Sequence, residues 1–196
     1  LTHEQADFDA VASLLGASII QSNSIPVLPM NMNRNVKAFI HLYSSEFPFY
    51  TLENLPQKPI ETVTLVDTQS LVTIKGMKKD SQIFVIDHHQ KRQDIPSSWN
   101  FFYVPTGACT TYFVEQFQEI NGHLPMLHAT LLLTGIYEDT GSLTYSNTTS
   151  RDVMAVAYLL NQGASLRIAT NFLNPPLSLQ QREVFDKLVD HIETIT

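Results

Sequence analysis

The chain has 196 residues, 43% of them hydrophobic, which is enough to bury one sizeable core. Its formal net charge of −7 argues against a broad basic surface for duplex nucleic acid. A single cysteine, Cys109, excludes an internal disulfide framework and fits a reducing, cytoplasmic compartment. No apolar stretch approaches the roughly 18 residues of a membrane span and no signal peptide is visible, so we expect no membrane partner.

Hydrophobic periodicity predicts helices that alternate with short strands. The predicted helices cover residues 8–20, 34–44, 108–120, 125–137, 151–161 and 178–194. The predicted strands cover residues 62–66, 83–86 and 100–104, with a short extended piece at 26–29 and a loop at 53–60. Thr149 followed by Asp152 resembles a capping box at the start of helix 151–161. The alternation predicts an α/β fold, with a mostly parallel sheet and helices on both of its faces.

Four groups of acidic and imidazole side chains lie at the ends of these predicted elements. The first group precedes helix 8–20, the second and third follow two strands, and the fourth ends an apolar helix. In chain order the groups are His3, Asp7 and Asp9; Asp67; Asp87, His88 and His89; and Asp139. Because α/β folds bind ligands where their strands end, we expect these side chains to face one pocket.

Carboxylates and imidazoles without a thiolate suit Mn²⁺, Mg²⁺ or Co²⁺ more than a structural zinc. The candidate ligands outnumber those that one ion uses, so we expect two divalent cations that share a bridging carboxylate. Two ions about 4 Å apart can clamp a phosphoryl oxygen and convert a water to hydroxide near neutral pH. The sequence therefore indicates hydrolysis of a phosphoester or a phosphoanhydride.

Each group also has an ordinary explanation. A lone aspartate after a strand, such as Asp67, is often a turn or cap residue. His88 and His89 could be surface or core histidines, and Asp7 and Asp9 could favour a helix N-terminus through its dipole. Four independent coincidences at four element ends explain the pattern less well than one metal site.

In this order, the four groups resemble the DHH phosphoesterase family, named after the tripeptide that stands here as Asp87-His88-His89. The resemblance implies two metal-binding sets that share Asp67 as a bridge. One set is His3 and Asp7, and the other is Asp9, His88 and Asp139. It also implies that His89 faces the substrate phosphate, with Asp67 and His88 as the other catalytic residues, and that Asp87 orients an adjacent imidazole.

Residues 29–36, 65–69 and 135–141 resemble a bacterial subgroup that joins a DHH module to CBS domains and a tRNA nucleotidyltransferase (poly(A) polymerase-like) domain. This implies a tRNA partner through the fused domains. Active family members usually carry a second, C-terminal domain, DHHA1 or DHHA2, which nothing here matches. The chain also opens at Leu1 without the strand expected before such a turn. We therefore expect residues 1–196 to be one DHH domain of a longer protein.

Substrate contacts are predicted less sharply. Gly107, just before helix 108–120, and Thr110, in its first turn, could offer backbone N–H groups to a phosphate, although a capped helix start explains them equally well. Arg92 could meet a nucleotide phosphate, but an exposed base after a strand is usually solvated. The aromatic residues at 101–103, 112–113 and 117 are expected in the core rather than as base-stacking platforms.

The leading hypothesis is a two-metal phosphoesterase that acts on a nucleotide or on short single-stranded nucleic acid, with Mn²⁺ as the first choice of metal and Mg²⁺ or Co²⁺ as alternatives. A second hypothesis is a non-catalytic nucleotide-binding or docking module of an RNA-processing protein. A third is an inorganic pyrophosphatase, whose basic second domain has no match here. The sequence leaves a homodimer open.

Overall fold

The computed structural model describes residues 1–175 and 177–191. Within these residues the helices are α1 (Phe8–Ile20), α2 (Arg34–Leu42), α3 (Cys109–Glu119), α4 (Met126–Asp139), α5 (Ser150–Asn161), α6 (Leu166–Leu173) and α7 (Leu179–Asp190). Two short 3₁₀-helices, η1 (Ser44–Glu46) and η2 (Leu52–Asn54), lie between α2 and the sheet in sequence. The strands are β1 (Ile60–Val66), β2 (Met77–Asp87) and β3 (Asn100–Tyr103).

The three strands form a parallel sheet in the order β1-β2-β3, which confirms the predicted α/β fold. Val66 pairs with Ile86, and Asp87 pairs with Tyr103, so the three strands end at one edge of the sheet. The Leu1 ammonium group donates a hydrogen bond to Thr64 O, and Leu1 O accepts one from Val66 N, so Leu1 lies beside β1.

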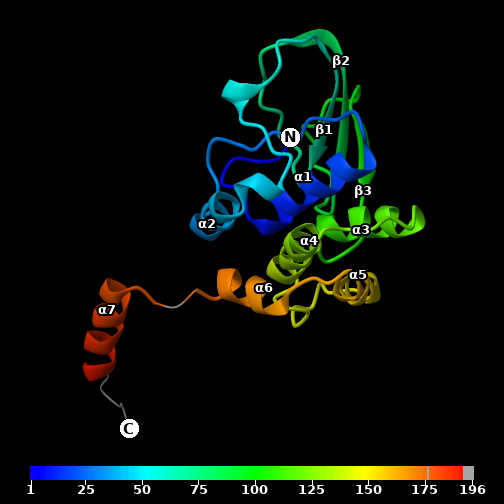
Figure 1. Cartoon of the computed structure of the whole chain (residues 1–196). Helices are drawn as coiled ribbons and strands as arrows, with labels where there is room; N and C mark the ends of the chain where they lie inside the picture. The colour runs from blue at the N-terminus through cyan, green and yellow to red at the C-terminus, as the bar shows by residue number, and fades with distance from the viewer. Residues whose placement is uncertain (176, 192–196) are drawn as a thin grey trace.

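Helix α1 lies at the centre of the main core and packs against α3 and α4 (Figure 1). Its residues from Phe8 to Ala17 are all buried, because the helix is covered by neighbours along most of its length. Close approach depends on two glycines. A Cβ on Gly16 would lie 2.5 Å from Phe113 Cβ, and one on Gly135 would lie 2.7 Å from Ala12 Cβ. The packing fixes the start of α1 beside the end of α4.

A second, smaller core covers one face of the sheet. It is formed by alternate residues of β1 and β2, namely Val63, Leu65, Ile83 and Val85, and Trp99 and Phe101 pack against it. Val66 and Ile86, which lie on the other face, belong to the main core with α1 and α3. The two-residue alternation of the strands therefore separates two sets of apolar contacts.

Some predicted boundaries differ from the observed ones. Strand β2 begins at Met77, earlier than the apolar run suggested, and helix α4 continues to Asp139. Helix α6 was not predicted. The capping box of Thr149 and Asp152 is confirmed. The last predicted helix is observed as α7, and its predicted end at residues 192–194 lies outside the described residues.

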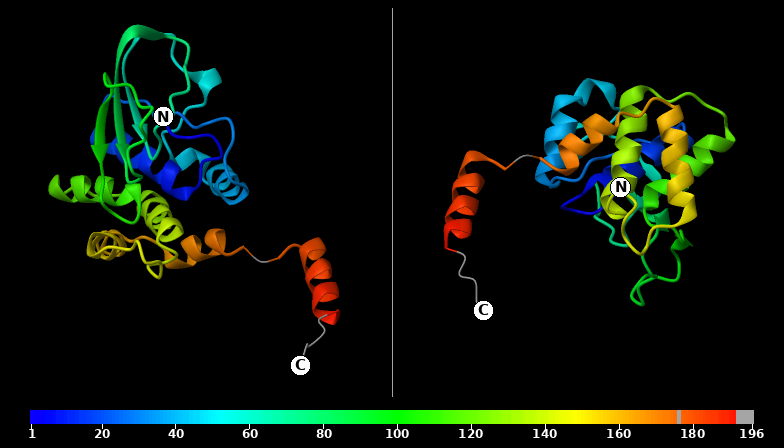
Figure 2. Two further views of the ribbon diagram at one scale, coloured as in Figure 1. Left: turned by 180° about the vertical axis from the view of Figure 1, so that it is seen from behind. Right: turned by 90° about the horizontal axis from the view of Figure 1, so that it is seen from below.

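Helix α7 lies apart from the rest of the molecule and has no buried residue (Figures 1 and 2). In contrast, helices α1 and α3–α6 pack on one another: α3 and α4 both contact α1, and α5 and α6 contact α4. Among the described residues, none of the helices combines the length and the apolar character needed to cross a bilayer.

Candidate metal centre

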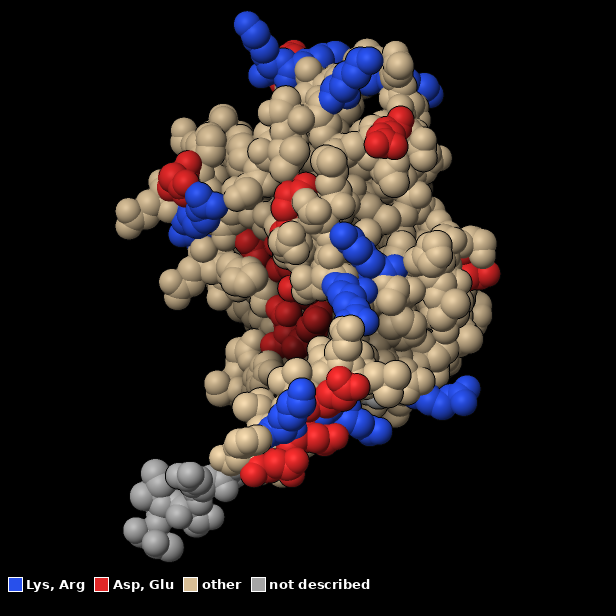
Figure 3. All heavy atoms as spheres, turned by 90° about the vertical axis from the view of Figure 1, so that its left-hand side faces the viewer, with Lys and Arg blue, Asp and Glu red and all other residues tan. Residues whose placement is uncertain are grey.

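The candidate site lies where the ends of β1 and β2 meet the ends of two helices. Asp67 follows β1 directly, and Asp87 is the last residue of β2. Asp9 belongs to the first turn of α1, and Asp139 is the last residue of α4. Figure 3 shows acidic side chains gathered on the floor of a hollow in the molecular surface. The fold thus brings carboxylates from four distant stretches of chain to one place.

Three overlapping groups of side chains offer ligand atoms that lie within 4.8 Å of one another. The groups are His3, Asp7 and Asp67; Asp9, His88 and Asp139; and Asp67, Asp87, His88 and His89. The first two groups contain the same residues as the two ligand sets that the family resemblance implies. Sharing of Asp67 and His88 makes the three groups one continuous cluster.

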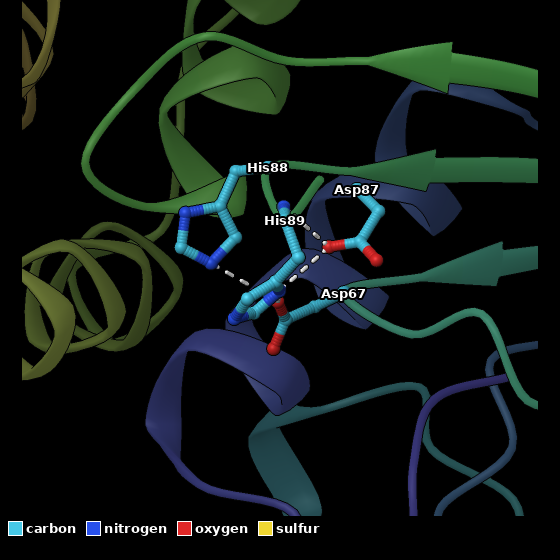
Figure 4. Close-up of side chains that lie close together, drawn as sticks. All are labelled: Asp67, Asp87, His88 and His89. Atoms are coloured by element: carbon cyan, nitrogen blue, oxygen red, sulfur yellow. Dashed lines mark hydrogen bonds and ion pairs between the residues drawn. The ribbon is translucent and has the colours of Figure 1, made fainter. Parts of the chain in front are cut away.

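Asp67 is the centre of this cluster. Its Oδ2 lies 3.6 Å from His3 Nε2, and its Oδ1 lies 3.4 Å from His88 Nε2. Figure 4 shows the rings of His88 and His89 turned toward Asp67, with His89 Nδ1 3.7 Å from Oδ1. The backbone of Asp67 has a φ of +52°, a left-handed conformation that non-glycine residues rarely adopt and that recurs at functional sites. Its two oxygens therefore face imidazoles from two sides, as a bridging ligand requires.

His88 also meets the carboxylates of the other helices. Its Nε2 lies 3.2 Å from Asp139 Oδ2 and 3.9 Å from Asp9 Oδ2. Asp139 stands at the C-terminal end of α4, where the helix dipole disfavours a negative charge. A carboxylate in that position needs nearby positive charge, which an imidazolium or a metal ion can supply.

Backbone carbonyls fix which nitrogen of two imidazoles faces the cluster. His3 Nδ1 lies 2.8 Å from Glu4 O, and His88 Nδ1 lies 3.3 Å from Thr106 O. Because a carbonyl oxygen can only accept, each Nδ1 carries a hydrogen. Nε2 is then the nitrogen that faces the carboxylates in both rings. This is the usual arrangement of a histidine that binds metal through Nε2.

Asp7 and Asp9 combine a helix-capping role with their place in the cluster. Asp7 is the N-cap of α1, and its Oδ1 accepts a hydrogen bond from Ala10 N. Asp9 is fully buried and accepts from Cys109 N and Thr110 N, at the start of α3. Both aspartates therefore do bind helix N-termini, as the ordinary explanation of these residues expects. That role does not explain why they also lie beside His3 and His88.

His89 is held by a different carboxylate. Its Nδ1 lies 2.8 Å from Asp87 Oδ1, which also accepts from the His89 backbone N–H. Gln69 Nε2 donates to Asp87 Oδ2 over 2.8 Å and fixes the other side of that carboxylate. The His89 side chain stays 63% exposed, so its Nε2 is available to a molecule in the hollow.

Two buried atoms at the centre, Asp67 Oδ1 and His88 Nε2, lie 3.4 Å apart but make no hydrogen bond with each other or with any other residue that the structure describes. A buried polar atom without a partner costs about 1–3 kcal/mol, and more when it is charged. Carboxylate oxygen and imidazole nitrogen are also common ligands of divalent metal ions. The residues present therefore fit a divalent cation, which would satisfy both atoms at once.

The same contacts shift the ionisation of the cluster. The contact with Asp67 raises the pKa of His3 to about 9, against the effect of burial. Burial lowers the pKa of His88, but the carboxylates of Asp139 and Asp67 raise it more, to about 11. At Asp67, burial raises the pKa, and the contacts with His3 and His88 outweigh burial and bring it below its ordinary value. Without metal, protons on the imidazoles balance the carboxylates.

The predicted substrate contacts lie outside the cluster. Gly107 N donates to Asp152, and Thr110 is fully buried with its N–H on Asp9, so both groups have partners inside the protein. Arg92 is exposed and pairs with Asp94. A substrate-binding role for Gly107, Thr110 and Arg92 therefore stays a prediction.

Sequence analysis missed three residues that shape the site. Glu138 accepts a hydrogen bond from Phe8 N, and its burial raises its pKa to about 7. Gln69 orients Asp87, and the carbonyl of Thr106 orients His88. Glu138 and Gln69 could have been found from the sequence, because they lie within two residues of the predicted ligands Asp139 and Asp67. No sequence pattern indicates that the backbone carbonyl of Thr106 orients His88.

A cleft with a volume of about 610 Å³ opens beside the cluster. Its lining includes the imidazoles of His88 and His89, the carboxylates of Glu138 and Asp139, and the side chains of Tyr103 and Tyr145. A larger cavity, of about 750 Å³, lies elsewhere, between the end of α1 and the start of β1, and contains none of the clustered residues. The smaller cleft is the one that can present a substrate to the imidazoles and carboxylates.

The chain is an α/β domain in which carboxylates and imidazoles gather where the parallel strands end, and this arrangement is suited to hold divalent metal ions. The chain belongs to the DHH family: the profile described as "DHH family, N-terminal domain" matches residues 1–136. The family resemblance seen in the sequence is therefore confirmed.

Curated relatives match nearly the whole chain. A-adding tRNA nucleotidyltransferases of Geobacter sulfurreducens and Aquifex aeolicus are 28% and 31% identical over 200 and 192 residues. Each match covers 98% of this chain and 23% of the relative, so the chain spans about a quarter of their length. A bifunctional oligoribonuclease and PAP phosphatase of Mycoplasma genitalium is 37% identical over 89 residues, which are 45% of this chain and 28% of that protein.

Two solved structures share the fold. An exopolyphosphatase-related protein of Bacteroides fragilis superposes with a TM-score of 0.67 at 14% identity, over 99% of this chain and 61% of the other. A candidate family II inorganic pyrophosphatase of Methanococcus jannaschii gives a TM-score of 0.65 at 19% identity, over 88% of this chain and 58% of the other. At these identities the likeness supports the fold alone.

Proposed function

We propose that the chain is a phosphoesterase domain that uses two divalent cations to hydrolyse phosphodiester or phosphomonoester bonds of nucleotides or short single-stranded nucleic acid. The observation that carries the proposal is the pair of unpartnered buried atoms, Asp67 Oδ1 and His88 Nε2, inside a cluster of carboxylates and imidazoles. Membership of the DHH family and the oligoribonuclease relative support the same reaction class.

In this proposal the two ligand sets divide the cluster, and Asp67 is the ligand common to both. His3 and Asp7 complete one set; Asp9, His88 and Asp139 complete the other. Bound there, two cations would neutralise charge on phosphoryl oxygens and supply hydroxide near neutral pH. The mixed oxygen and imidazole ligands favour Mn²⁺, with Mg²⁺ or Co²⁺ as alternatives.

His89 is the proposed catalytic residue that touches the substrate. Asp87 holds its Nδ1, and this contact raises the His89 pKa against burial. A protonated Nε2 in the cleft can donate a hydrogen bond to a phosphoryl oxygen or a proton to the leaving group. Asp87 is then a positioning residue, because it acts through the imidazole that it orients.

The setting of the domain is also a proposal. Because the A-adding relatives are about four times as long as this chain, we infer that it works as a DHH domain of a larger tRNA nucleotidyltransferase-like protein. A tRNA partner through fused domains follows from that inference. A cytoplasmic location and a homodimer remain predictions from the sequence.

The test is metal-dependent hydrolysis by the chain and by Asp67→Asn, with Asp80→Asn as the matched control. Asp80 is an exposed carboxylate of β2 outside the cluster, so its substitution makes the same chemical change without touching the site. A dinucleotide, a nucleoside monophosphate and inorganic pyrophosphate are each offered with Mn²⁺ or Mg²⁺.

We expect hydrolysis of a nucleotide substrate by the parent chain and by Asp80→Asn, and loss of activity in Asp67→Asn. Turnover of pyrophosphate alone would favour the pyrophosphatase alternative. Tight nucleotide binding without turnover of any substrate would favour the docking module. Activity of Asp67→Asn equal to that of Asp80→Asn would refute the assignment of the site.

A further inference from the structure

The loop between α4 and α5, residues 140–149, has an unusual backbone. Gly141, Ser142 and Leu143 are three consecutive residues with φ values of +54°, +56° and +71°. Leucine rarely adopts this left-handed conformation, so the surrounding structure must impose it. Hydrogen bonds from Ser142 N to Tyr137 O and from Leu143 N to Thr140 Oγ1 fasten the loop to the end of α4. Strain of this kind concentrates at ligand-binding positions.

The loop fixes one aromatic ring, that of Tyr145. Its backbone N–H donates to Thr140 O, and its ring lies against Gly141, where a Cβ would approach Tyr145 Cε1 to 2.3 Å. Glycine at 141 thus leaves the space that the Tyr145 ring occupies beside the backbone. Tyr145 is nevertheless 58% exposed. The fold therefore holds a large, amphipathic side chain against the loop while leaving more than half of the residue exposed to solvent.

Tyr145 lines the same cleft as the metal cluster. Tyr103, at the end of β3, lines it too and is 48% exposed, contrary to the expectation that residues 101–103 are buried in the core. Tyr103 pairs with Asp87 across the sheet, so it stands next to the DHH tripeptide. The side-chain Nδ2 of Asn147, in the same loop, donates to the backbone O of Asp139 and so ties the loop to a residue that is a proposed metal ligand. Hydrogen bonds and strand pairing thus connect both aromatic residues to the elements that carry the candidate metal ligands.

The chemistry of the cleft wall discriminates between substrates. Among the described residues its lining contains no lysine or arginine, while Glu138 and Asp139 add negative charge. Lysine and arginine side chains make strong, charge-assisted hydrogen bonds with phosphate groups, and a polyanion such as pyrophosphate gains most from them. A nucleotide presents one phosphate to the cluster and a flat base that can stack on an exposed ring. The lining therefore suits a base-carrying substrate better than an inorganic one.

We propose that Tyr145, together with Tyr103, stacks on the base next to the phosphate that is hydrolysed, and so determines specificity for nucleotides. This inference rests on the proposed function. The phenol oxygen is not required for stacking, so Tyr145→Phe should behave as the parent chain does. Tyr145→Ala removes the ring, and because the side chain is exposed the fold should survive, which circular dichroism checks.

The test compares a dinucleotide with an abasic dinucleotide that has the same phosphodiester but no bases. Stacking is worth about 1–3 kcal/mol per base, so Tyr145→Ala should raise the KM for the dinucleotide by about 5- to 150-fold. The KM for the abasic compound and the kcat for both should stay within about twofold. Tyr103→Ala should produce a smaller rise of the same kind.

A second readout is independent of turnover. A dinucleotide containing 2-aminopurine, mixed with the chain and non-catalytic Ca²⁺, should lose fluorescence on stacking; Tyr145→Phe should keep this quenching and Tyr145→Ala should lose it. An unchanged dinucleotide KM in Tyr145→Ala, or an equal rise for the abasic compound, overturns the inference. If the parent hydrolyses nothing, the proposed function fails. In that case the fluorescence quenching alone tests the stacking role of Tyr145. Quenching by the parent chain that is lost in Tyr145→Ala supports this role, and no quenching by the parent chain overturns it.

Discussion

Asp152 offers the sharpest test of how the framework of the site is held together. This fully buried carboxylate stands in the first turn of α5, and its Oδ2 accepts from Gly107 N at 2.9 Å and Thr149 N at 2.7 Å. Its Oδ1 accepts from the Thr111 hydroxyl. One side chain thus joins the start of α5 to the turn before α3, whose N-terminal N–H groups hold Asp9.

Asp152→Ala leaves the buried N–H of Gly107 and the partly buried N–H of Thr149 without an acceptor. At about 1–3 kcal/mol for the buried group and less for the other, the free energy of unfolding should fall by about 2–4 kcal/mol. Asp152→Asn should cost less than about 2 kcal/mol. An amide oxygen can accept both backbone N–H groups, while its NH₂ donates to Thr111, whose hydroxyl can turn from donor to acceptor. The difference between the two variants therefore measures the network and not the volume of the side chain.

Urea unfolding followed by the fluorescence of Trp99, the single tryptophan, gives both values. Burial raises the pKa of Asp152, but hydrogen bonds from Thr111 and Thr149 outweigh it and leave the pKa below its ordinary value. The charge therefore stabilises the fold above about pH 4, and this contribution is lost as the pH falls below that. The gap between the parent and Asp152→Asn should shrink accordingly. An Asp152→Ala variant no less stable than Asp152→Asn would refute the reasoning.

Three further outcomes follow from the geometry. Gly16→Ala places a Cβ 2.5 Å from Phe113 Cβ, so urea unfolding should show a loss of about 1–3 kcal/mol; an unchanged midpoint would mean that α1 and α3 can separate freely. At pH 7 the raised pKa values of His3 and His88 keep both rings protonated, so metal binding should release at least two protons and tighten as the pH rises toward 9. Calorimetry in two buffers of different ionisation enthalpy counts these protons, and a count of zero would contradict the ligand assignment. His89→Gln should lower kcat by about 10²- to 10⁴-fold with the metal content unchanged, as elemental analysis beside the assay would show; full activity would remove His89 from the mechanism.

Much of the fold follows from local sequence. The strands ending at Val66 and Asp87 and the whole of α1 are visible as apolar runs or helical periodicity. Convergence of the acidic groups is also predictable, because parallel strands that follow each other in a sheet end at one edge. The sequence therefore predicts that Asp67, Asp87 and His88 lie in one region of the fold.

Features that depend on tertiary contacts were not predictable in the same way. The first residues of β2 are polar, and their pairing with β1 is irregular between Ile60 and Thr62, so no apolar pattern marks them. Tyr103 is exposed at an edge of the sheet, because β3 pairs with β2 alone among the described residues. Helix α6 has only eight residues, so its hydrophobic periodicity is short and was not recognised. Its N-cap residue, Ser165, is the one local feature that could have indicated where the helix begins.

Hydrogen-bond partners were the hardest part to predict. Gly107 N and Thr110 N precede or begin a helix, which from sequence alone makes them available to an anion. In the fold, Asp152 and Asp9 already occupy these positions. Both carboxylates come from other helices, at separations of 45 and 101 residues, and no local pattern reports such a pairing.

The central claim is that Asp67 is shared by two metal ions. The most direct measurement is the number of Mn²⁺ ions bound per chain, by calorimetry and by elemental analysis after gel filtration. The parent chain and Asp80→Asn should each bind two ions, and Asp67→Asn should lose both or retain one with weakened affinity. Two tightly bound ions in Asp67→Asn, or none in the parent chain, would contradict the account.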